Sequence, residues 1–261
     1  MSLTFRDLTT LDDFAAVVNL ERRIWGPGYE DVVPMPILAV TVKRGGILVG
    51  AFDGDRMVGF VYSMAGLKDG RPTQWSHMLG VAEEYRDAGL GFRLKLLQRD
   101  RALAMGLDLV EWTFDPMQAA NAHLNFAKLG VVVEDYEENA YGESASPLHA
   151  GNPTDRFVAE WRIRKPHVRS TFEEARPANN AKAVGEWLEC AGMDLSLDVR
   201  RLTVQIPVGF TDMLSRNPEL ALAWRLRTRE IFTTYFARGY RAVDFQLDRA
   251  ARLGAYLLTR N

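Results

Sequence analysis

Residues 81–91, Val-Ala-Glu-Glu-Tyr-Arg-Asp-Ala-Gly-Leu-Gly, constrain the fold more than any other stretch of this chain. They follow an apolar segment typical of a strand, His77 to Val81, and precede a long amphipathic helix pattern. The first turn of a helix leaves backbone N–H groups without partners and carries a partial positive charge. Because Gly89 and Gly91 let the backbone approach a ligand closely, we expect an anion such as a diphosphate to bind here.

The residues after the two glycines alternate between helix and strand patterns. Apolar residues recur at helical spacing from Leu90 to Ala104, and Gly106 is placed to end that helix in the left-handed conformation. A buried strand is predicted over 109–114, where Asp115-Pro116 ends it. A second helix over 119–129 ends at Gly130, and 131–133 begin another strand.

The residues before the glycines predict an antiparallel meander. Asp53-Gly54 lies between two apolar runs and is a strong hairpin signal. The expected elements are a strand at 3–8, helices from Thr10 and over 36–43, and strands at 47–52, 57–64 and 74–81. This order favours a mixed sheet over a doubly wound dinucleotide fold. The glycine spacing is also neither Gly-x-Gly-x-x-Gly nor a P-loop.

Two motifs resemble those of a known family. Arg86-x-x-Gly89-x-Gly91 resembles the acyl-CoA pyrophosphate loop of the GNAT superfamily of N-acyltransferases, whose pattern is Arg/Gln-x-x-Gly-x-Gly/Ala. Residues 121–130, Asn-Ala-His-Leu-Asn-Phe-Ala-Lys-Leu-Gly, resemble its Asn-x-x-Ala-x-x-Leu-Tyr-x-x-x-Gly segment. The order of elements is similar too. The resemblance covers roughly residues 3–163 and is specific across 77–131.

The resemblance implies an α/β protein with a mixed sheet of the GNAT type, extended by a C-terminal α/β segment. It implies acetyl-CoA or another acyl-CoA as co-substrate, and transfer of the acyl group to a primary amine of a small molecule or peptide. An acyl-CoA-binding regulatory protein without turnover is the alternative, and an α/β binding module without CoA is a third possibility. The residues implied to bind the cofactor are Leu79, Val81, Arg86, Asp87, Ala88, Gly89, Leu90, Gly91, Asn121 and Phe126.

The sequence departs from the family pattern at Phe126. Many members carry a tyrosine there, four residues before the glycine, that protonates the departing thiolate, and phenylalanine has no proton to donate. His77, Tyr136, Tyr141 or water are the possible substitutes. We predict Tyr141 and His77 as catalytic residues, and Tyr141, at the edge of a loop, is the better candidate. His77, between Ser76 and Met78, is also typical of a half-buried strand histidine.

Two loops are candidates for the acceptor site. In the family, the connection between the first two helices commonly forms one wall of the acceptor pocket, so Trp25, Tyr29 and Pro34 to Pro36 are possible substrate contacts. A rigid turn with a core tryptophan is the other reading. Residues 142–155 form the clearest loop, either a cover over the acceptor site or a disordered segment.

The second half of the chain has a weaker pattern. We predict a domain over 1–163, a linker over 164–180 and a C-terminal α/β half over 181–261, which contains a helix at 181–191. A strand at 201–207, a helix between Asn217 and Gly239 and strands near 243–247 and 255–258 follow. Residues 201–247 repeat the plan of 74–114 without its glycines. The segment is either a degenerate repeat that contributes to the sheet, a pocket wall or a homodimer contact, or an ordinary βαβ unit. In both cases we expect it to bind no second CoA.

Composition excludes several classes of function. The net charge of -2, from 32 basic and 34 acidic residues, gives no electrostatic case for nucleic acid binding. No apolar run approaches the roughly 20 residues that span a bilayer, and acidic residues near the N-terminus disfavour a secretory signal. The single Cys190 indicates a reducing cytoplasm without disulfides. His123, His149 and His167 show no metal-ligand spacing, so no metal is expected.

Overall fold

The computed structural model describes residues 3–26, 29, 31–86, 88–142 and 151–260. These residues form two compact units. The N-terminal unit comprises Met1–Trp112 and Arg162–Pro166, and the C-terminal unit comprises Thr113–Trp161 and His167–Asn261. This division differs from the predicted boundary after residue 163, because residues 113–161 pack with the C-terminal half of the chain.

The sheet of the N-terminal unit has the strand order β1-β2-β3-β4-β5. The meander predicted from the Asp-Gly turn is confirmed, since β1 to β4 pair antiparallel in succession. β4 and β5 pair in parallel at Gln74↔Val110 and Trp75↔Glu111. The strands are β1 (Thr4–Asp7), β2 (Ile47–Asp53), β3 (Arg56–Lys68), β4 (Arg71–Val81) and β5 (Leu109–Phe114).

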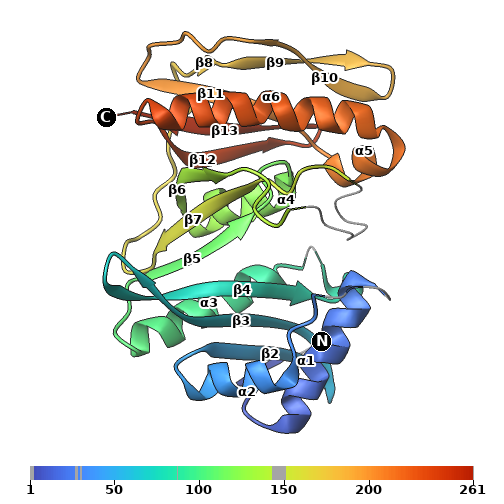
Figure 1. Ribbon diagram of the computed structural model, residues 1–261, viewed down its shortest axis with the longest axis vertical. Helices are drawn as coiled ribbons and strands as arrows, with labels where there is room; N and C mark the ends of the chain where they lie inside the picture. The colour runs from blue at the N-terminus through green and yellow to red at the C-terminus, as the bar shows by residue number, and fades with distance from the viewer. Residues whose placement is uncertain (1–2, 27–28, 30, 87, 143–150, 261) are drawn as a thin grey trace. The chain divides into compact units, whose positions relative to one another are not determined.

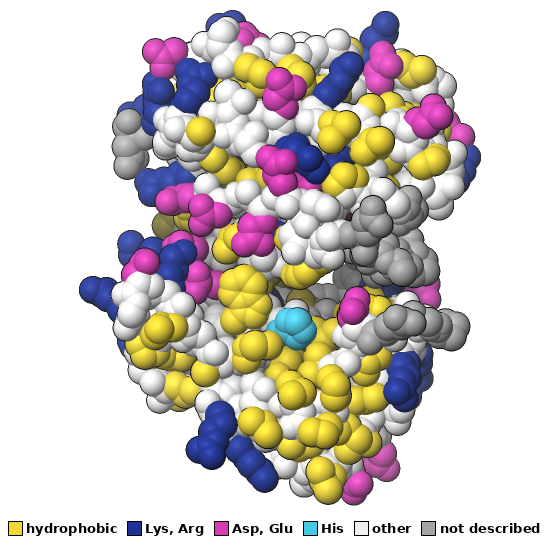
Figure 2. Space-filling view, in the orientation of Figure 1, with side chains coloured by type: hydrophobic (Ala, Val, Ile, Leu, Met, Phe, Trp, Pro, Cys, Tyr) yellow, Lys and Arg dark blue, Asp and Glu magenta, His cyan; other side chains and the backbone are white. Residues whose placement is uncertain are grey.

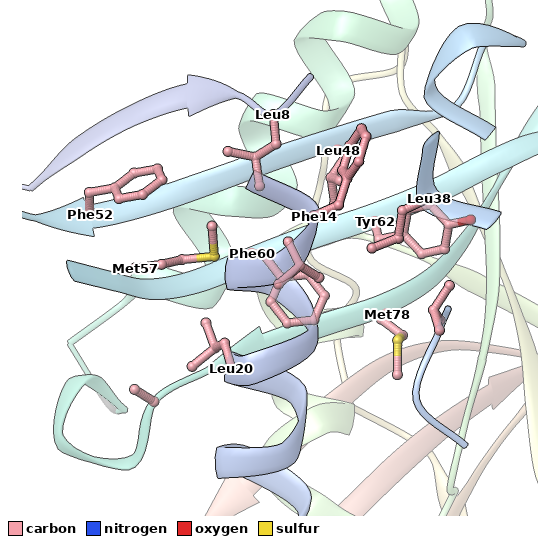
Figure 3. Packing of buried hydrophobic residues seen from close by; sticks show 13 residues of the cluster. Leu8, Phe14, Leu20, Leu38, Leu48, Phe52, Met57, Phe60, Tyr62 and Met78 are labelled. Carbon is pink, nitrogen blue, oxygen red and sulfur yellow. The ribbon is translucent and has the colours of Figure 1, made fainter. Parts of the chain in front are cut away.

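Helices cover both faces of this sheet (Figure 1): α1 (Leu11–Trp25) and α2 (Met35–Lys43) lie on one face and α3 (Leu90–Ala104) on the other. α1 begins with a capping box, in which Thr10 accepts from the backbone of Asp13 and the Asp13 side chain accepts in return. Between α1, α2 and β2–β4 lies an apolar core (Figure 3). Its fully buried members include Leu8, Val17, Leu38, Phe60 and Tyr62.

The sheet of the C-terminal unit has the strand order β7-β6-β12-β13-β11-β8. Its strands are β6 (Val132–Glu137), β7 (Arg156–Arg162), β8 (Arg176–Pro177), β11 (Arg201–Pro207), β12 (Arg241–Asp248) and β13 (Leu253–Thr259). Its helices are α4 (Ala119–Ala122), the π-helix η2 (His123–Leu129), α5 (Phe210–Arg216) and α6 (Pro218–Ala237). α5 and β8 were not predicted, whereas α6 begins at the predicted cap, Asn217.

An internal two-fold repeat organises this unit. The first copy is η2, β6 and β7, and the second is α6, β12 and β13; each helix is followed by a glycine with positive φ, Gly130 or Gly239. In each copy the two strands pair antiparallel, and the register shifts directly after Val133 or after Ala242. These two equivalent residues pair with each other across β6 and β12. A local two-fold axis therefore passes between them.

The repeat differs from the predicted one. The sequence pattern matched residues 201–247 to 74–114, whose strands β4 and β5 pair directly and in parallel. In the C-terminal unit β13 lies between β11 and β12 and pairs antiparallel with both. Strand pairing therefore relates the C-terminal elements to 123–162 instead.

The predicted helix over 181–191 is wrong. These residues form an antiparallel hairpin of β9 (Asn179–Val184) and β10 (Trp187–Met193). Gly185 has φ +59° in the two-residue turn between the paired residues Val184 and Trp187. The Trp224 indole of α6 donates to the Leu188 carbonyl at 2.7 Å. Tertiary contacts thus outweigh the helix propensity of this alanine-containing segment. Cys190, predicted on a buried helix face, is buried on β10.

Candidate functional site

The predicted anion-binding loop connects β4 to α3 in the N-terminal unit. After Val81 the chain pairs once more with β3, through Ala82 N and Val58 O at 2.9 Å, and then forms the 3-10 turn η1 (Glu83–Tyr85). The Tyr85 hydroxyl fixes this turn by donating to the Asp53 carboxylate at 2.5 Å. The Arg86 side chain is exposed, and its Nε donates to the Val81 carbonyl at 3.4 Å.

Gly89 is the N-cap residue of α3 and lies, as predicted, where the chain passes from strand to helix. Its φ of +77° is a conformation that favours glycine, and a Cβ added there would meet only open space. No side-chain cap hydrogen bond is present at this helix start among the described residues, so the amides of the first turn have no side-chain acceptor there. Together with the helix dipole, these amides suit a phosphate or diphosphate group. The described residues of the loop therefore fit the anionic part of CoA.

The neighbouring predicted contacts surround the start of α3. A Cβ on Gly91 would lie 3.6 Å from Leu79 Cδ2 and 3.9 Å from Val81 Cγ2, so both half-buried side chains point toward this glycine. Leu90 is buried and Ala88 is exposed. Asp87, also predicted to bind the cofactor, lies outside the described residues.

His77 is the extra residue of a bulge in β4. Tyr62 pairs with Met78, whereas the next residue of β3, Ser63, pairs with Ser76. The His77 ring meets the Tyr62 ring edge to face, with centroids 5.9 Å apart. The His77 side chain is exposed to solvent on one side, yet desolvation by the surrounding protein lowers its pKa. Bulges of this kind re-aim side chains near active sites.

Glu21 is a candidate that the motifs did not indicate. It is fully buried on α1, where Oε2 accepts from Val33 N at 2.9 Å and Oε1 has no partner among the described residues. Burial raises the pKa of this carboxyl to about 7. A sequence signal exists, because Glu21 follows Phe14 and Val17 at helical spacing and so lies on the apolar face.

The predicted acceptor wall is aromatic. The rings of Trp25 and Tyr29 stack with centroids 5.3 Å apart, and Trp25 also meets Phe60 at 6.3 Å. The side chains are only partly buried. The geometry fits a packed turn and a substrate-facing wall equally, so both interpretations stay open.

The remaining predicted contacts lie in the C-terminal unit. Asn121 is exposed on α4, directly before the π-helix, an arrangement often found at functional sites. Phe126 is fully buried, and its ring meets Phe114 at 6.1 Å and Tyr256 at 5.5 Å. The Phe126 ring therefore packs in an aromatic core, and its role in cofactor binding stays a prediction.

Tyr141 has an exposed side chain and a fixed backbone. Its hydroxyl lies 2.8 Å from Thr113 Oγ1, and its N–H donates to Thr154 Oγ1 at 3.0 Å. Tyr136, the other tyrosine considered, donates to the buried Asp155 carboxylate at 2.6 Å. Burial, and then the Asp155 charge, raise the pKa of Tyr136. Tyr141 is therefore the more available proton donor of the two. Residues 143–150 of the predicted loop lie outside the described residues.

Other classes of site have little support. Within the described ranges no group of three or more His, Cys, Asp or Glu side chains is arranged to hold a metal ion. In the same ranges no helix combines the length and apolar character needed to cross a bilayer. Figure 2 shows basic and acidic side chains interspersed on the face it presents.

Solved structures share this fold. A GNAT-family protein from Desulfovibrio desulfuricans matches with a TM-score of 0.50 and 16% identity, over 62% of this chain and 99% of that one. The ribosomal-protein-S18-alanine N-acetyltransferase from Escherichia coli matches with a TM-score of 0.51 and 18% identity, over 66% and 100%. YncA from Salmonella typhimurium, solved with its cofactor acetyl-CoA, matches with a TM-score of 0.51 and 16% identity, over 66% and 99%.

These matches show that the chain has the GNAT fold, an α/β fold with a mixed sheet, as predicted. No protein-family model and no curated protein matches the sequence.

Proposed function

We propose that this protein is an N-acyltransferase that moves an acetyl or related acyl group from acyl-CoA to a primary amine. The observation that carries the proposal is the start of α3, where uncapped amides follow a left-handed Gly89. On a GNAT fold this loop suits the CoA diphosphate, with Arg86 as an adjacent positive charge. We also assign to CoA the backbone groups of Leu79 and Val81 and the polar side chain of Asn121.

The reaction forms an amide bond and breaks a thioester bond. The neutral amine attacks the carbonyl carbon, the C–S bond breaks, the amine loses a proton and the thiolate gains one. An amine of pKa near 10.4 is neutral in only about 1 part in 2,500 at pH 7, so desolvation or a base must assist. Positioning alone supplies roughly 7 to 11 kcal/mol and one acid or base about 10²- to 10⁴-fold, so a single missing donor need not abolish turnover.

Tyr141 is the proposed donor to the thiolate, and His77 is the proposed residue for removing the amine proton. The lowered pKa of His77 keeps its imidazole neutral at pH 7, as a base requires. The acceptor is a small amine, an aminoglycoside-type antibiotic, an amino acid or a peptide N-terminus. Of the structures that share the fold, the one from Escherichia coli is named for an alanine of a ribosomal protein.

One observation favours a second function. The fully buried Phe126 stands where the family pattern has a tyrosine, which is what a protein that binds acyl-CoA without turnover would tolerate. Because the chain has a single cysteine, Cys190, a reducing cytoplasm stays the predicted compartment. The homodimer also stays a prediction.

Calorimetric titration with acetyl-CoA tests the cofactor. Gly89→Val places a branched side chain at φ +77° and should weaken binding at least tenfold, whereas Gly91→Ala has room for its Cβ and should bind within threefold of the parent protein. Absence of heat at millimolar acetyl-CoA would exclude both functions. Thiol release over a panel of amines, amino acids and peptides then separates the enzyme from the regulatory binder.

A further inference from the structure

A chain of hydrogen bonds runs from helix α6 to Tyr141 within the C-terminal unit. Its last link is the Tyr141 backbone N–H, which donates to the hydroxyl of Thr154 at 3.0 Å. The neighbouring Ala140 N–H donates to the Thr154 carbonyl at 3.2 Å. Thr154 is 1% exposed and fixes the backbone of Tyr141, whose side chain is 59% exposed. The backbone position from which the Tyr141 side chain reaches Thr113 therefore depends on what holds Thr154.

Asn139 and Asp155 hold Thr154. The Asn139 side-chain oxygen accepts from both the backbone and the hydroxyl of Thr154, at 3.2 Å each. Asn139 has a φ of +48°, and its own N–H donates to Asp155 Oδ1 at 3.0 Å. A positive φ in a residue other than glycine needs support from its surroundings. The Asp155 carboxylate provides that support.

Asp155 is a fully buried carboxylate whose direct cationic partner is Arg229 of α6. Arg229 binds it with two parallel bonds, from Nε at 2.9 Å and from Nη2 at 2.7 Å. Tyr136 donates to the same carboxylate at 2.6 Å. A buried carboxylate that loses its partner cation is strongly disfavoured, and the two parallel bonds from Arg229 fix the orientation of the Asp155 carboxylate.

We propose that Arg229 is a positioning residue for Tyr141, acting through Asp155, Asn139 and Thr154. The second copy of the internal repeat thus fixes the backbone of the residue that the proposed function uses as its proton donor. The catalytic part of this inference rests on the proposed function, whereas the positioning part concerns the geometry alone. Arg229→Lys keeps the charge but loses the two parallel bonds, and it is the preferred variant because it leaves Asp155 with a cation.

Amide hydrogen exchange tests the positioning part. In Arg229→Lys, exchange of the amides at 139–141 should be at least tenfold faster than in the parent protein, and in Arg229→Gln faster still. Arg238→Lys, at the C-cap of the same helix, is the matched control, because Arg238 donates to the carbonyls of Leu195 and Leu197 instead. Exchange at 139–141 that is the same in Arg229→Lys and Arg238→Lys would overturn the proposal, whether or not the protein is active.

Steady-state kinetics test the catalytic part. Tyr141→Phe should lower kcat about 10²-fold. Arg229→Lys should lower kcat about tenfold with the KM for acetyl-CoA within twofold, and the double variant should match Tyr141→Phe alone. If the two losses in kcat multiply in the double variant, Arg229 does not act through Tyr141, and the inference is overturned. If the parent protein shows no turnover, the proposed enzyme falls, and the exchange result alone decides the positioning of Tyr141.

Discussion

Glu21 shows how one buried acid sets a pH dependence. Its pKa rises from 4.5 to about 7 in the folded protein, chiefly through burial. Since a tenfold change in proton affinity is worth about 1.4 kcal/mol, this rise amounts to about 3 kcal/mol. The folded state holds the proton more tightly than the unfolded state. The contribution to stability is therefore complete below about pH 4.5 and is lost as the pH rises through 7.

We therefore expect the free energy of unfolding to fall by about 2 to 3 kcal/mol more between pH 5 and pH 8 in the parent protein than in Glu21→Gln. Glutamine keeps an oxygen for the Val33 N–H but does not titrate. Urea unfolding at the two pH values measures this difference, with the exposed Glu83→Gln as control. Equal pH dependence in Glu21→Gln and the parent protein would contradict the assignment.

Single residues also mark the limit of prediction from sequence. The pattern of α3 placed Lys95 and Gln98 between apolar positions, yet both are buried, and both donate to Ser76 Oγ, at 2.9 and 3.0 Å. The Lys95 ammonium lies 3.5 Å from the centre of the Trp112 ring, and burial lowers its pKa well below the usual value. Helical spacing identifies a face, but it does not reveal a polar network beneath it.

At the scale of elements, strong local signals predicted the structure well. The helix from Thr10, the Asp-Gly turn before β3 and the strand-to-helix transition at Gly89 all appear where the sequence indicated. The failed prediction at 181–191 has a physical cause, because this hairpin is stabilised by a contact to α6, 36 residues later in the chain. The split of the predicted helix at 119–129 into α4 and a π-helix likewise had no local signal.

Gly185→Ala discriminates between helix and hairpin. In a helix this change would stabilise the protein by roughly 0.5 to 1 kcal/mol, whereas at φ +59° in a tight turn it should destabilise the protein by about 1 kcal/mol. Gly192→Ala, in the same hairpin without a positive φ and with open space around its Cβ, serves as control. Thermal unfolding of the three proteins measures the difference, and a higher Tm for Gly185→Ala would contradict the hairpin.

At the scale of the molecule, a buried ion pair within the C-terminal unit links α6 to the residue that follows β5. Arg225 of α6 binds Asp115, directly after β5, with bonds of 2.5 and 2.8 Å, and also binds Asn152 at 3.2 Å. The sequence pattern matched residues 201–247 to 74–114, whereas the strand pairing relates the C-terminal elements to 123–162. The order strand–helix–strand does not specify which strands pair. The equivalence became visible only from the bulges and from the Val133↔Ala242 pair.

We expect Arg225→Leu to destabilise the protein by about 3 to 5 kcal/mol, because it leaves the Asp115 carboxylate buried without a cation. Arg216→Leu removes an exposed pair with Glu186, in which both side chains are more than half exposed, and should cost at most about 1 kcal/mol. Urea unfolding compares the two. Similar losses in both variants would show that the buried pair contributes no more to stability than the exposed one.

The length of the strands at the ends of the large sheet affects how the protein behaves at high concentration. The net charge of -2 provides little repulsion between molecules, so colloidal stability must come from elsewhere. The end strands of the large sheet, β1 and β8, have only 4 and 2 residues, and β8 includes Pro177, which has no backbone N–H. End strands this short give a neighbouring molecule little template for adding a strand to this sheet, which disfavours fibril growth through it.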